Sequence, residues 1–116
     1  MNQILLIEDD PDQSALYERV LSLTGYQVTA VPNGESALGQ LADHHFDLVL
    51  SDWYLPGMSG DVLIAEVKKQ HQLVRTILMS SHHEVSAAAR KSGADGCLQK
   101  GDLRQLLALV AALLTG

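Results

Sequence analysis

The sequence has little of several features that mark specialised classes of protein. Its single cysteine cannot form an internal disulfide, and it has no run of about 18 apolar residues that could cross a membrane. Positive charge is scarce, because 8 Lys and Arg residues stand against 14 Asp and Glu residues, for a net charge of −6. That sign is wrong for a surface that grips a phosphate backbone. Direct binding to nucleic acid or to a membrane is therefore not expected.

The start of the chain, MNQILLIEDD, lacks the basic first part and the long apolar stretch of a secretory signal. We therefore expect a cytoplasmic protein. Hydrophobic residues make up 47% and charged residues 19% of the 116 residues, a composition that can build one core. No repeat, low-complexity tract or linker divides the chain, so we predict a single domain over residues 1–116.

Short apolar runs alternate with longer segments of helical period. The runs are Ile4–Ile7, Val28–Val31, Leu48–Leu50, Thr76–Met79 and Gly96–Leu98. Between them apolar residues recur every three or four positions, most clearly from Leu103 to Leu113. Parallel strands need crossover connections, which are usually helices. The pattern predicts an α/β fold: a flavodoxin-like, doubly wound parallel sheet of five strands with five helices.

The character of the runs indicates the strand order. The first, third and fourth runs are continuously apolar and suit the interior of a sheet, whereas Thr29 and Gly96 are typical of edge strands. This favours the order 2-1-3-4-5. Helix starts are expected at Asp12, Asn33, Ser59 and Asp102, and helix ends at Gly25 and Gly93. A less apolar helix is expected from Glu84 to Lys91, with Val85 and three alanines on its buried face.

Chemically capable side chains collect just after the predicted strands. Glu8, Asp9 and Asp10 follow the first strand, and the third, fourth and fifth end in Asp52, Ser80 and Lys100. In open α/β sheets ligands bind at this edge, beside the point where the strand order reverses. The predicted order makes the first and third strands neighbours. The first acidic cluster should therefore face Asp52 across a crevice.

The clustered acids favour a hard divalent cation. Close carboxylates raise one another's pKa unless a cation compensates their charge. Mg²⁺ fits best, because it keeps several waters and often shares its shell with phosphate. The plainer alternative is a set of solvated loop and cap residues. With Mg²⁺, an ionised Asp52 can attack phosphorus to form an aspartyl phosphate, while Lys100 pairs with the phosphoryl group and Ser80 donates a hydrogen bond.

Other functions fit the pattern less well. No G-x-x-x-x-G-K-[ST] loop is present, so the chain should receive a phosphoryl group rather than bind and hydrolyse a nucleotide. A flavodoxin-like module for a flavin phosphate is one alternative, but Glu8, Asp9 and Asp10 would repel that phosphate. An aspartate-dependent phosphohydrolase is another, but Tyr54 stands where its second catalytic aspartate is wanted.

Four motifs, ILLIEDDPD, LVLSDWYLPGMSG, ILMSSH and GADGCLQK, stand in an order and spacing that resembles the receiver domain of two-component response regulators, such as the chemotaxis regulators. The resemblance covers essentially the whole chain. It implies a signalling module rather than an enzyme, with Asp52 as the phosphoacceptor and Mg²⁺ as the cofactor. It implies a histidine kinase or a His-containing phosphotransfer domain as donor and an output partner of unknown identity. The oligomeric state stays open, a homodimer included.

The resemblance also implies roles for the metal-binding side of the site. Asp9 is the expected direct Mg²⁺ ligand beside Asp52, and Glu8 acts nearer the second layer of ligands. Asp10 is expected to open the first helix. The backbone carbonyl of Tyr54 is a further expected ligand, so the identity of its side chain should not affect the metal.

On the switching side, Ser80 resembles the family's switch hydroxyl, with Ser81 as the competing choice, and Lys100 resembles the lysine that meets the phosphoryl group. Two positions depart from the family. Cys97 replaces the usual aromatic residue of the fifth strand, and Gly101 replaces the proline after the lysine. Without that ring, we expect the phosphorylated state to be read out through the loop after Ser80.

Two remaining features receive plain interpretations. Cys97 is expected to be a small buried hydrophobic residue rather than a redox centre. The pairs His44-His45 and His82-His83 are expected to be solvated loop residues, because adjacent histidines point apart and lack a third ligand at a usable spacing.

Overall fold

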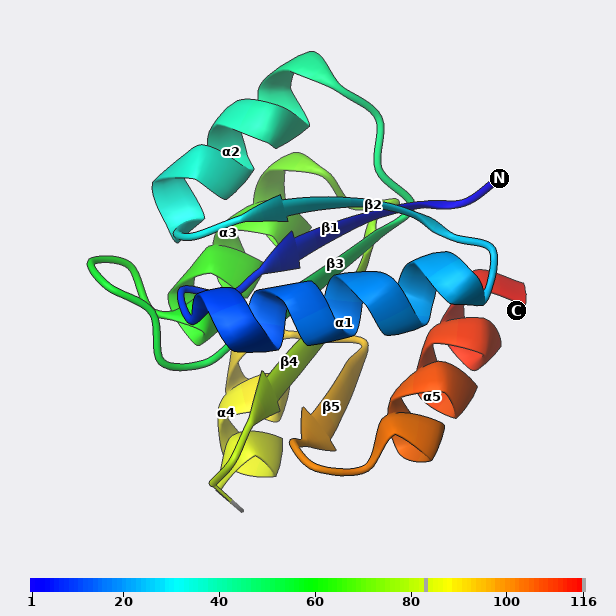
Figure 1. The fold of residues 1–116 in the computed structure, drawn as a ribbon. Helices are drawn as coiled ribbons and strands as arrows, with labels where there is room; N and C mark the ends of the chain where they lie inside the picture. Colours follow the sequence, from blue (N-terminus) through cyan, green and yellow to red (C-terminus); the bar gives the residue numbers. More distant parts are fainter. Residues whose placement is uncertain (83, 116) are drawn as a thin grey trace.

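The structure is a computed structural model that describes residues 1–82 and 84–115. Its strands are β1 (Gln3–Ile7), β2 (Gln27–Val31), β3 (Leu48–Asp52), β4 (Arg75–Ser80) and β5 (Gly96–Gln99). Its helices are α1 (Pro11–Leu23), α2 (Gly34–Asp43), α3 (Gly60–Gln70), α4 (Val85–Ser92) and α5 (Leu103–Thr115). The strands form one parallel sheet in the order β2-β1-β3-β4-β5, which confirms the predicted fold class and order (Figure 1).

The sheet is covered on both faces because successive side chains of each strand point in opposite directions. Ile4 and Leu6 of β1 pack with Leu21 of α1 and with Leu106 of α5. Leu5, between them, packs toward α2 and α3 on the opposite face. Helices α3 and α4 meet over the same side as α2, near β4. Each fully buried leucine or isoleucine contributes on the order of 2 kcal/mol, so the central strands dominate stability.

The first helix begins earlier than predicted. Asp10, and not Asp12, is the N-cap of α1, and one of its carboxylate oxygens accepts hydrogen bonds from the backbone N–H groups of Asp12 (2.9 Å) and Gln13 (3.4 Å). Pro11 explains the difference, since it lacks an N–H and has the φ angle that suits the first helical position. The prediction that Asp10 opens this helix is confirmed.

The other predicted helix boundaries agree with the structure. Asn33 caps α2 through a hydrogen bond from Ser36 N (2.8 Å), and Asp102 accepts one from Gln105 N (3.1 Å) before α5. Ser59 is the N-cap residue of α3 but makes no side-chain cap bond. Gly25, with φ of 105°, and Gly93, with φ of 82°, follow α1 and α4 in the left-handed conformation that glycine adopts without strain.

Two expectations about buried side chains are wrong. Cys97 is exposed, because it lies on the edge strand β5 and no further strand covers it. In α4, Val85 and Ala89 are buried, whereas Ala87 is exposed and Ala88 is half-buried. The helix is therefore held by fewer apolar contacts than its alanine content suggested.

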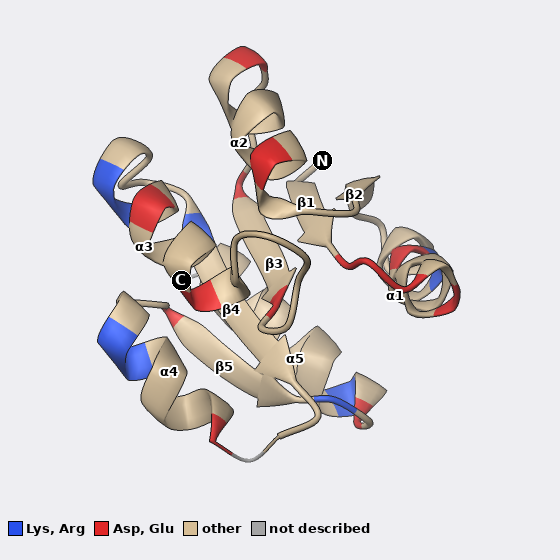
Figure 2. Cartoon of the chain, turned by 90° about the vertical axis from the view of Figure 1, so that its left-hand side faces the viewer, with Lys and Arg blue, Asp and Glu red and all other residues tan. Residues whose placement is uncertain are grey.

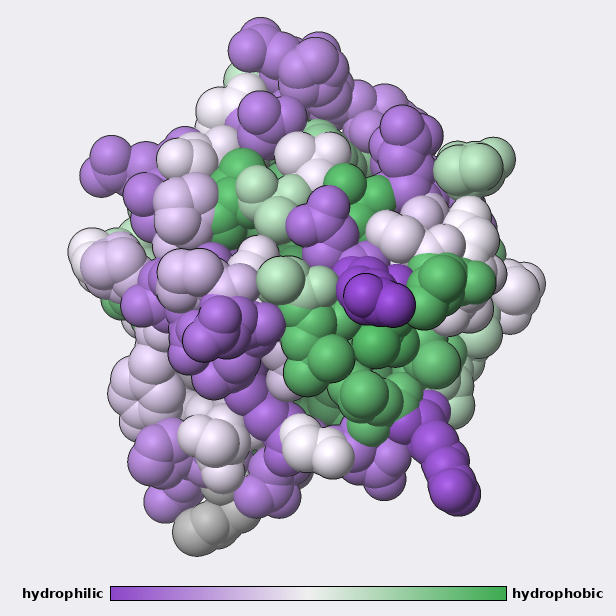
Figure 3. Space-filling view, in the orientation of Figure 1, coloured by the Kyte–Doolittle hydropathy of each residue, from purple (hydrophilic) through white to green (hydrophobic). Residues whose placement is uncertain are grey.

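An apolar area lies on the outer surface over α5 and the adjacent part of α1 (Figure 3). Leu16 and Leu23 of α1 are exposed, and half-buried leucines of α5 continue from Leu103 to Leu114. Within the described residues, no helix is long and apolar enough to cross a membrane.

Candidate functional site

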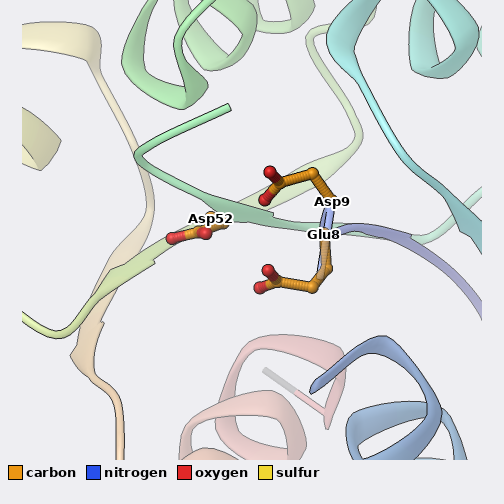
Figure 4. A group of neighbouring side chains, drawn as sticks. All are labelled: Glu8, Asp9 and Asp52. Atoms are coloured by element: carbon orange, nitrogen blue, oxygen red, sulfur yellow. The ribbon is translucent and has the colours of Figure 1, made fainter. Parts of the chain in front are cut away.

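Three carboxylates meet at the carboxyl ends of β1 and β3. Each of Glu8, Asp9 and Asp52 places an oxygen within 4.8 Å of those of the other two. Figure 4 shows Glu8 and Asp9 extending from the end of β1 toward Asp52 at the end of β3, and Figure 2 shows the acidic segment that leads from β1 into α1. Glu8 and Asp52 are 3% and 7% exposed, whereas Asp9 is open to solvent. The predicted juxtaposition across the reversal of strand order is confirmed.

The backbone around Asp52 is fixed from both sides. Trp53 N donates to Met79 O of β4 (2.8 Å), and Gly60 N donates to Trp53 O (2.8 Å). Gly60 also lies so close to Asp52 that a Cβ there would overlap the carbonyl group of Asp52. Glycine at the start of α3 therefore lets this helix pack directly on the end of β3. The backbone that carries the Asp52 side chain is thus held by β4 and by the start of α3.

Lys100 supplies the positive charge of the site. Its Nζ lies 2.8 Å from Glu8 Oε2 and 3.2 Å from Asp52 Oδ2, and its side chain is 13% exposed. The backbone N–H of Lys100 donates to Ser80 O (2.8 Å), which anchors the residue at the end of β5 beside β4. The structure thus brings together the lysine and the two acids that the sequence singled out.

The charges of this site are unbalanced. Burial raises the pKa of Glu8, and the charge of Asp52 adds to that rise, while the hydrogen bond from Lys100 opposes it. For Lys100, burial lowers the pKa, but the hydrogen bond to Glu8 and the charges of Asp52 and Glu8 outweigh it and leave the pKa above 10.5. Among the described residues, Lys100 is thus the one cation beside these three carboxylates, and negative charge is in excess.

These residues fit a magnesium ion. Carboxylate oxygens are the donors that hard divalent cations prefer, and the excess negative charge on Glu8, Asp9 and Asp52 would be compensated by such an ion. Tyr54, the predicted source of a carbonyl ligand, is 58% exposed, and its ring stacks on that of Trp53 with ring centroids 5.2 Å apart. The Tyr54 ring also packs edge-to-face against the ring of His82, with ring centroids 5.1 Å apart.

Of the two candidate hydroxyls, Ser80 is the one buried near the acids. Ser80 follows Met79, the residue of β4 that pairs with Asp52, and it is 1% exposed. Its Oγ accepts a hydrogen bond from His82 N (3.1 Å). Ser81 is exposed. This geometry favours Ser80 as the hydroxyl of the site.

The described members of the two histidine pairs lie at the surface. His44 and His45 are exposed beyond the end of α2, and His45 Nε2 lies 3.0 Å from Asp47 Oδ1. His82 is exposed as well, so the solvated interpretation is confirmed for these three. His83 lies outside the described residues.

The sequence does not predict the contact between Gln13 and Lys100 at this site. Gln13 Oε1 accepts a hydrogen bond from Lys100 Nζ at 2.6 Å, and Gln13 Nε2 donates to Asp10 Oδ2 at 3.3 Å. The sequence does indicate that Gln13 lies in the first helical turn, because Asp10-x-x-Gln13 has the spacing of a capping box. Nothing in the sequence indicates its contact with Lys100.

Comparison with known proteins agrees with this geometry. Residues 4–111 match the family model of the response regulator receiver domain. The transcriptional regulatory protein MalR of Bacillus subtilis is 38% identical over 87 residues, which cover 73% of this chain and 37% of MalR. The DNA-binding transcriptional regulator NtrC of Salmonella typhimurium is 34% identical over 110 residues, covering 92% of this chain and 24% of NtrC. The matched residues thus make up between 24% and 37% of the length of these relatives.

Solved structures extend the likeness to three dimensions. The response regulator TrrA of Thermotoga maritima, in complex with Mg²⁺ and BeF, matches with a TM-score of 0.93 at 29% identity, over 98% of this chain and 100% of TrrA. TrrA in complex with the histidine kinase ThkA matches with a TM-score of 0.89 at 30% identity, over 98% of this chain and 99% of the other. The family model, the relatives and the fold agree with the motifs, and the chain belongs to the response regulator receiver domain family, a signalling module of two-component systems.

Proposed function

We propose that Asp52 accepts the phosphoryl group in this receiver domain, which spans residues 1–116. Asp9, Asp52 and the backbone carbonyl of Tyr54 would bind Mg²⁺ directly, and Glu8 would act behind them. The observation that carries this proposal is the meeting of Glu8, Asp9 and Asp52 within 4.8 Å, with Lys100 Nζ 3.2 Å from Asp52. When bound, Mg²⁺ supplies positive charge that neutralises the oxygens of the incoming phosphoryl group.

The donor is proposed to be a phosphohistidine of a histidine kinase or of a His-containing phosphotransfer domain. A carboxylate oxygen of Asp52 attacks phosphorus, the phosphorus–nitrogen bond of the donor breaks, and its electron pair stays with the imidazole ring. The product is an aspartyl phosphate. Lys100 pairs with a phosphoryl oxygen as a compact cation, and the Ser80 hydroxyl donates a hydrogen bond to another.

Two properties of TrrA support this assignment. It was solved with Mg²⁺ and BeF, and also with the histidine kinase ThkA, and its fold covers 98% of this chain. We propose that this encounter takes place in the cytoplasm. Phosphorylation would then switch a surface that binds an output partner, whose identity is open because the chain spans a minor part of regulators such as NtrC.

The test is phosphorylation by a small donor. The protein is incubated with acetyl phosphate, with and without Mg²⁺, and its intact mass is measured. We expect one phosphate adduct that forms with Mg²⁺ and does not form when the metal is left out or chelated before the donor is added. A protein that stays unmodified while it binds Mg²⁺ would contradict the proposed function.

A further inference from the structure

Gln13 joins helix α1 to the proposed phosphoryl site. It lies in the first turn of α1, where its side chain is half-buried. Its Oε1 accepts the hydrogen bond from Lys100 at 2.6 Å, and its Nε2 donates to the N-cap carboxylate of Asp10 at 3.3 Å. A chain of contacts therefore runs from Asp10 through Gln13 and Lys100 to Asp52.

Lys100 Nζ makes as many polar contacts at the site as it has N–H bonds to donate. An ammonium group has three N–H bonds and no acceptor. The described contacts of Nζ at the site are Gln13 at 2.6 Å, Glu8 at 2.8 Å and Asp52 at 3.2 Å. The two shorter contacts hold the ammonium group against β1 and α1. The longest contact directs the remaining N–H toward Asp52, where a phosphoryl oxygen would replace the carboxylate as acceptor.

The neutral amide of Gln13 suits this task. Lysine has a flexible stem, and ordering it costs side-chain entropy. Two fixed acceptors remove most of that freedom before the phosphoryl group arrives, which is preorganisation. Because Gln13 carries no charge, it orients Lys100 without neutralising the cation as another carboxylate would.

We infer that Gln13 is a positioning residue that holds Lys100 for the phosphoryl group, a role that rests on the proposed function of Asp52. Removing the amide leaves Lys100 with one fixed acceptor besides Asp52. The affinity for a phosphoryl group or its mimic then falls, while the carboxylates Glu8, Asp9 and Asp52 keep their places. Gln13 is thus a determinant of phosphoryl binding but not of metal binding.

The test compares Gln13→Met with the parent protein. Methionine has a similar length but offers no strong acceptor or donor. Binding of beryllofluoride at saturating Mg²⁺ and binding of Mg²⁺ alone are each measured by calorimetry. We expect beryllofluoride to bind roughly threefold to tenfold more weakly to Gln13→Met, the size of one partly exposed hydrogen bond, and Mg²⁺ affinity to stay within about twofold.

A matched control and a double-mutant cycle complete the experiment. Gln105→Met changes the same residue type on the exposed side of α5 and should leave both affinities unchanged. In a Lys100→Met background, Gln13→Met should have no further effect on beryllofluoride binding, because its partner is gone. Unchanged beryllofluoride affinity in Gln13→Met, an equal loss of Mg²⁺ affinity, or additive losses in the double variant would each overturn the inference. Failure of the parent protein to bind beryllofluoride would instead contradict the proposed function.

Discussion

Lys100 Nζ lies 3.2 Å from Asp52 Oδ2, and the two side chains are 13% and 10% exposed. The cation and the proposed nucleophile therefore meet in a largely water-free place, where charge interactions are stronger than at the surface. Glu8 shares the same cation at 2.8 Å. The close approach of these charges, and the packing that maintains it, determine how pH and substitutions should affect the protein.

The first prediction concerns pH. Because the pKa of Glu8 lies above its ordinary value of 4.5, mainly through burial, the folded metal-free protein holds this proton more tightly than the unfolded chain. The stability that Glu8 contributes is fully present below its unfolded pKa and is lost as pH rises through the folded pKa. Glu8→Gln, which does not titrate, should therefore gain stability relative to the parent between about pH 4 and about pH 7. Urea denaturation at both pH values measures this, and an unchanged difference between variant and parent would contradict it.

The second prediction concerns Gly60. A Cβ at this position would overlap the backbone carbonyl of Asp52, so Gly60→Ala must push α3 away from β3. We expect a loss of about 1–3 kcal/mol in the free energy of unfolding and weaker Mg²⁺ binding. Gly39→Ala is the control, because its Cβ would meet nothing within 4 Å inside α2, and it should stabilise by roughly 0.5–1 kcal/mol. Equal effects of the two substitutions would show that Gly60 does not position Asp52.

The third prediction uses Trp53, the single tryptophan of the chain. Its backbone follows Asp52, and its ring stacks on Tyr54, so an ion bound at the acids should alter the environment of the indole. Mg²⁺ titration should change Trp53 fluorescence in a saturable way, and Asp9→Asn should shift the curve to higher Mg²⁺ concentration. A flat titration, with binding confirmed by calorimetry, would mean that the indole does not sense the site.

The fourth prediction concerns readout. Cys97 has no ring to change rotamer, and Ser80 Oγ already accepts a hydrogen bond from His82 N, at the start of the connection to α4. With Val85 and Ala89 as its buried side chains, α4 should move at low cost. Ser80→Ala should leave phosphorylation largely intact but abolish the change in amide hydrogen exchange across α4 that beryllofluoride causes in the parent protein. An equal change in both proteins would place the readout nearer Trp53.

Much of this fold is predictable because its signals are local. Apolar runs give the strands, helical spacing gives the crossovers, and continuous apolarity separates interior strands from the edges at Thr29 and Gly96. The acids and Lys100 are predictable because strand ends of a parallel sheet share one edge. None of these inferences needs the geometry of a side chain.

The errors have equally physical causes. The helix cap lies at Asp10 and not at Asp12, because Pro11 suits the first helical position. Cys97 is exposed because its place on an edge strand outweighs the preference of cysteine for the interior. The bond between Gln13 and Lys100 joins two long flexible side chains from opposite ends of the chain, and no periodicity or motif encodes such a meeting.

The central claim is that Asp52 carries the phosphoryl group, and intact mass after treatment with acetyl phosphate and Mg²⁺ tests it most directly. The parent protein and Asp43→Asn, a control at an exposed acid that ends α2, should both gain one phosphate adduct. Asp52→Asn should gain none, because an amide does not form the acyl phosphate, although its circular dichroism should match that of the parent. An adduct that persists in folded Asp52→Asn would contradict the account and place the phosphoryl group on another residue.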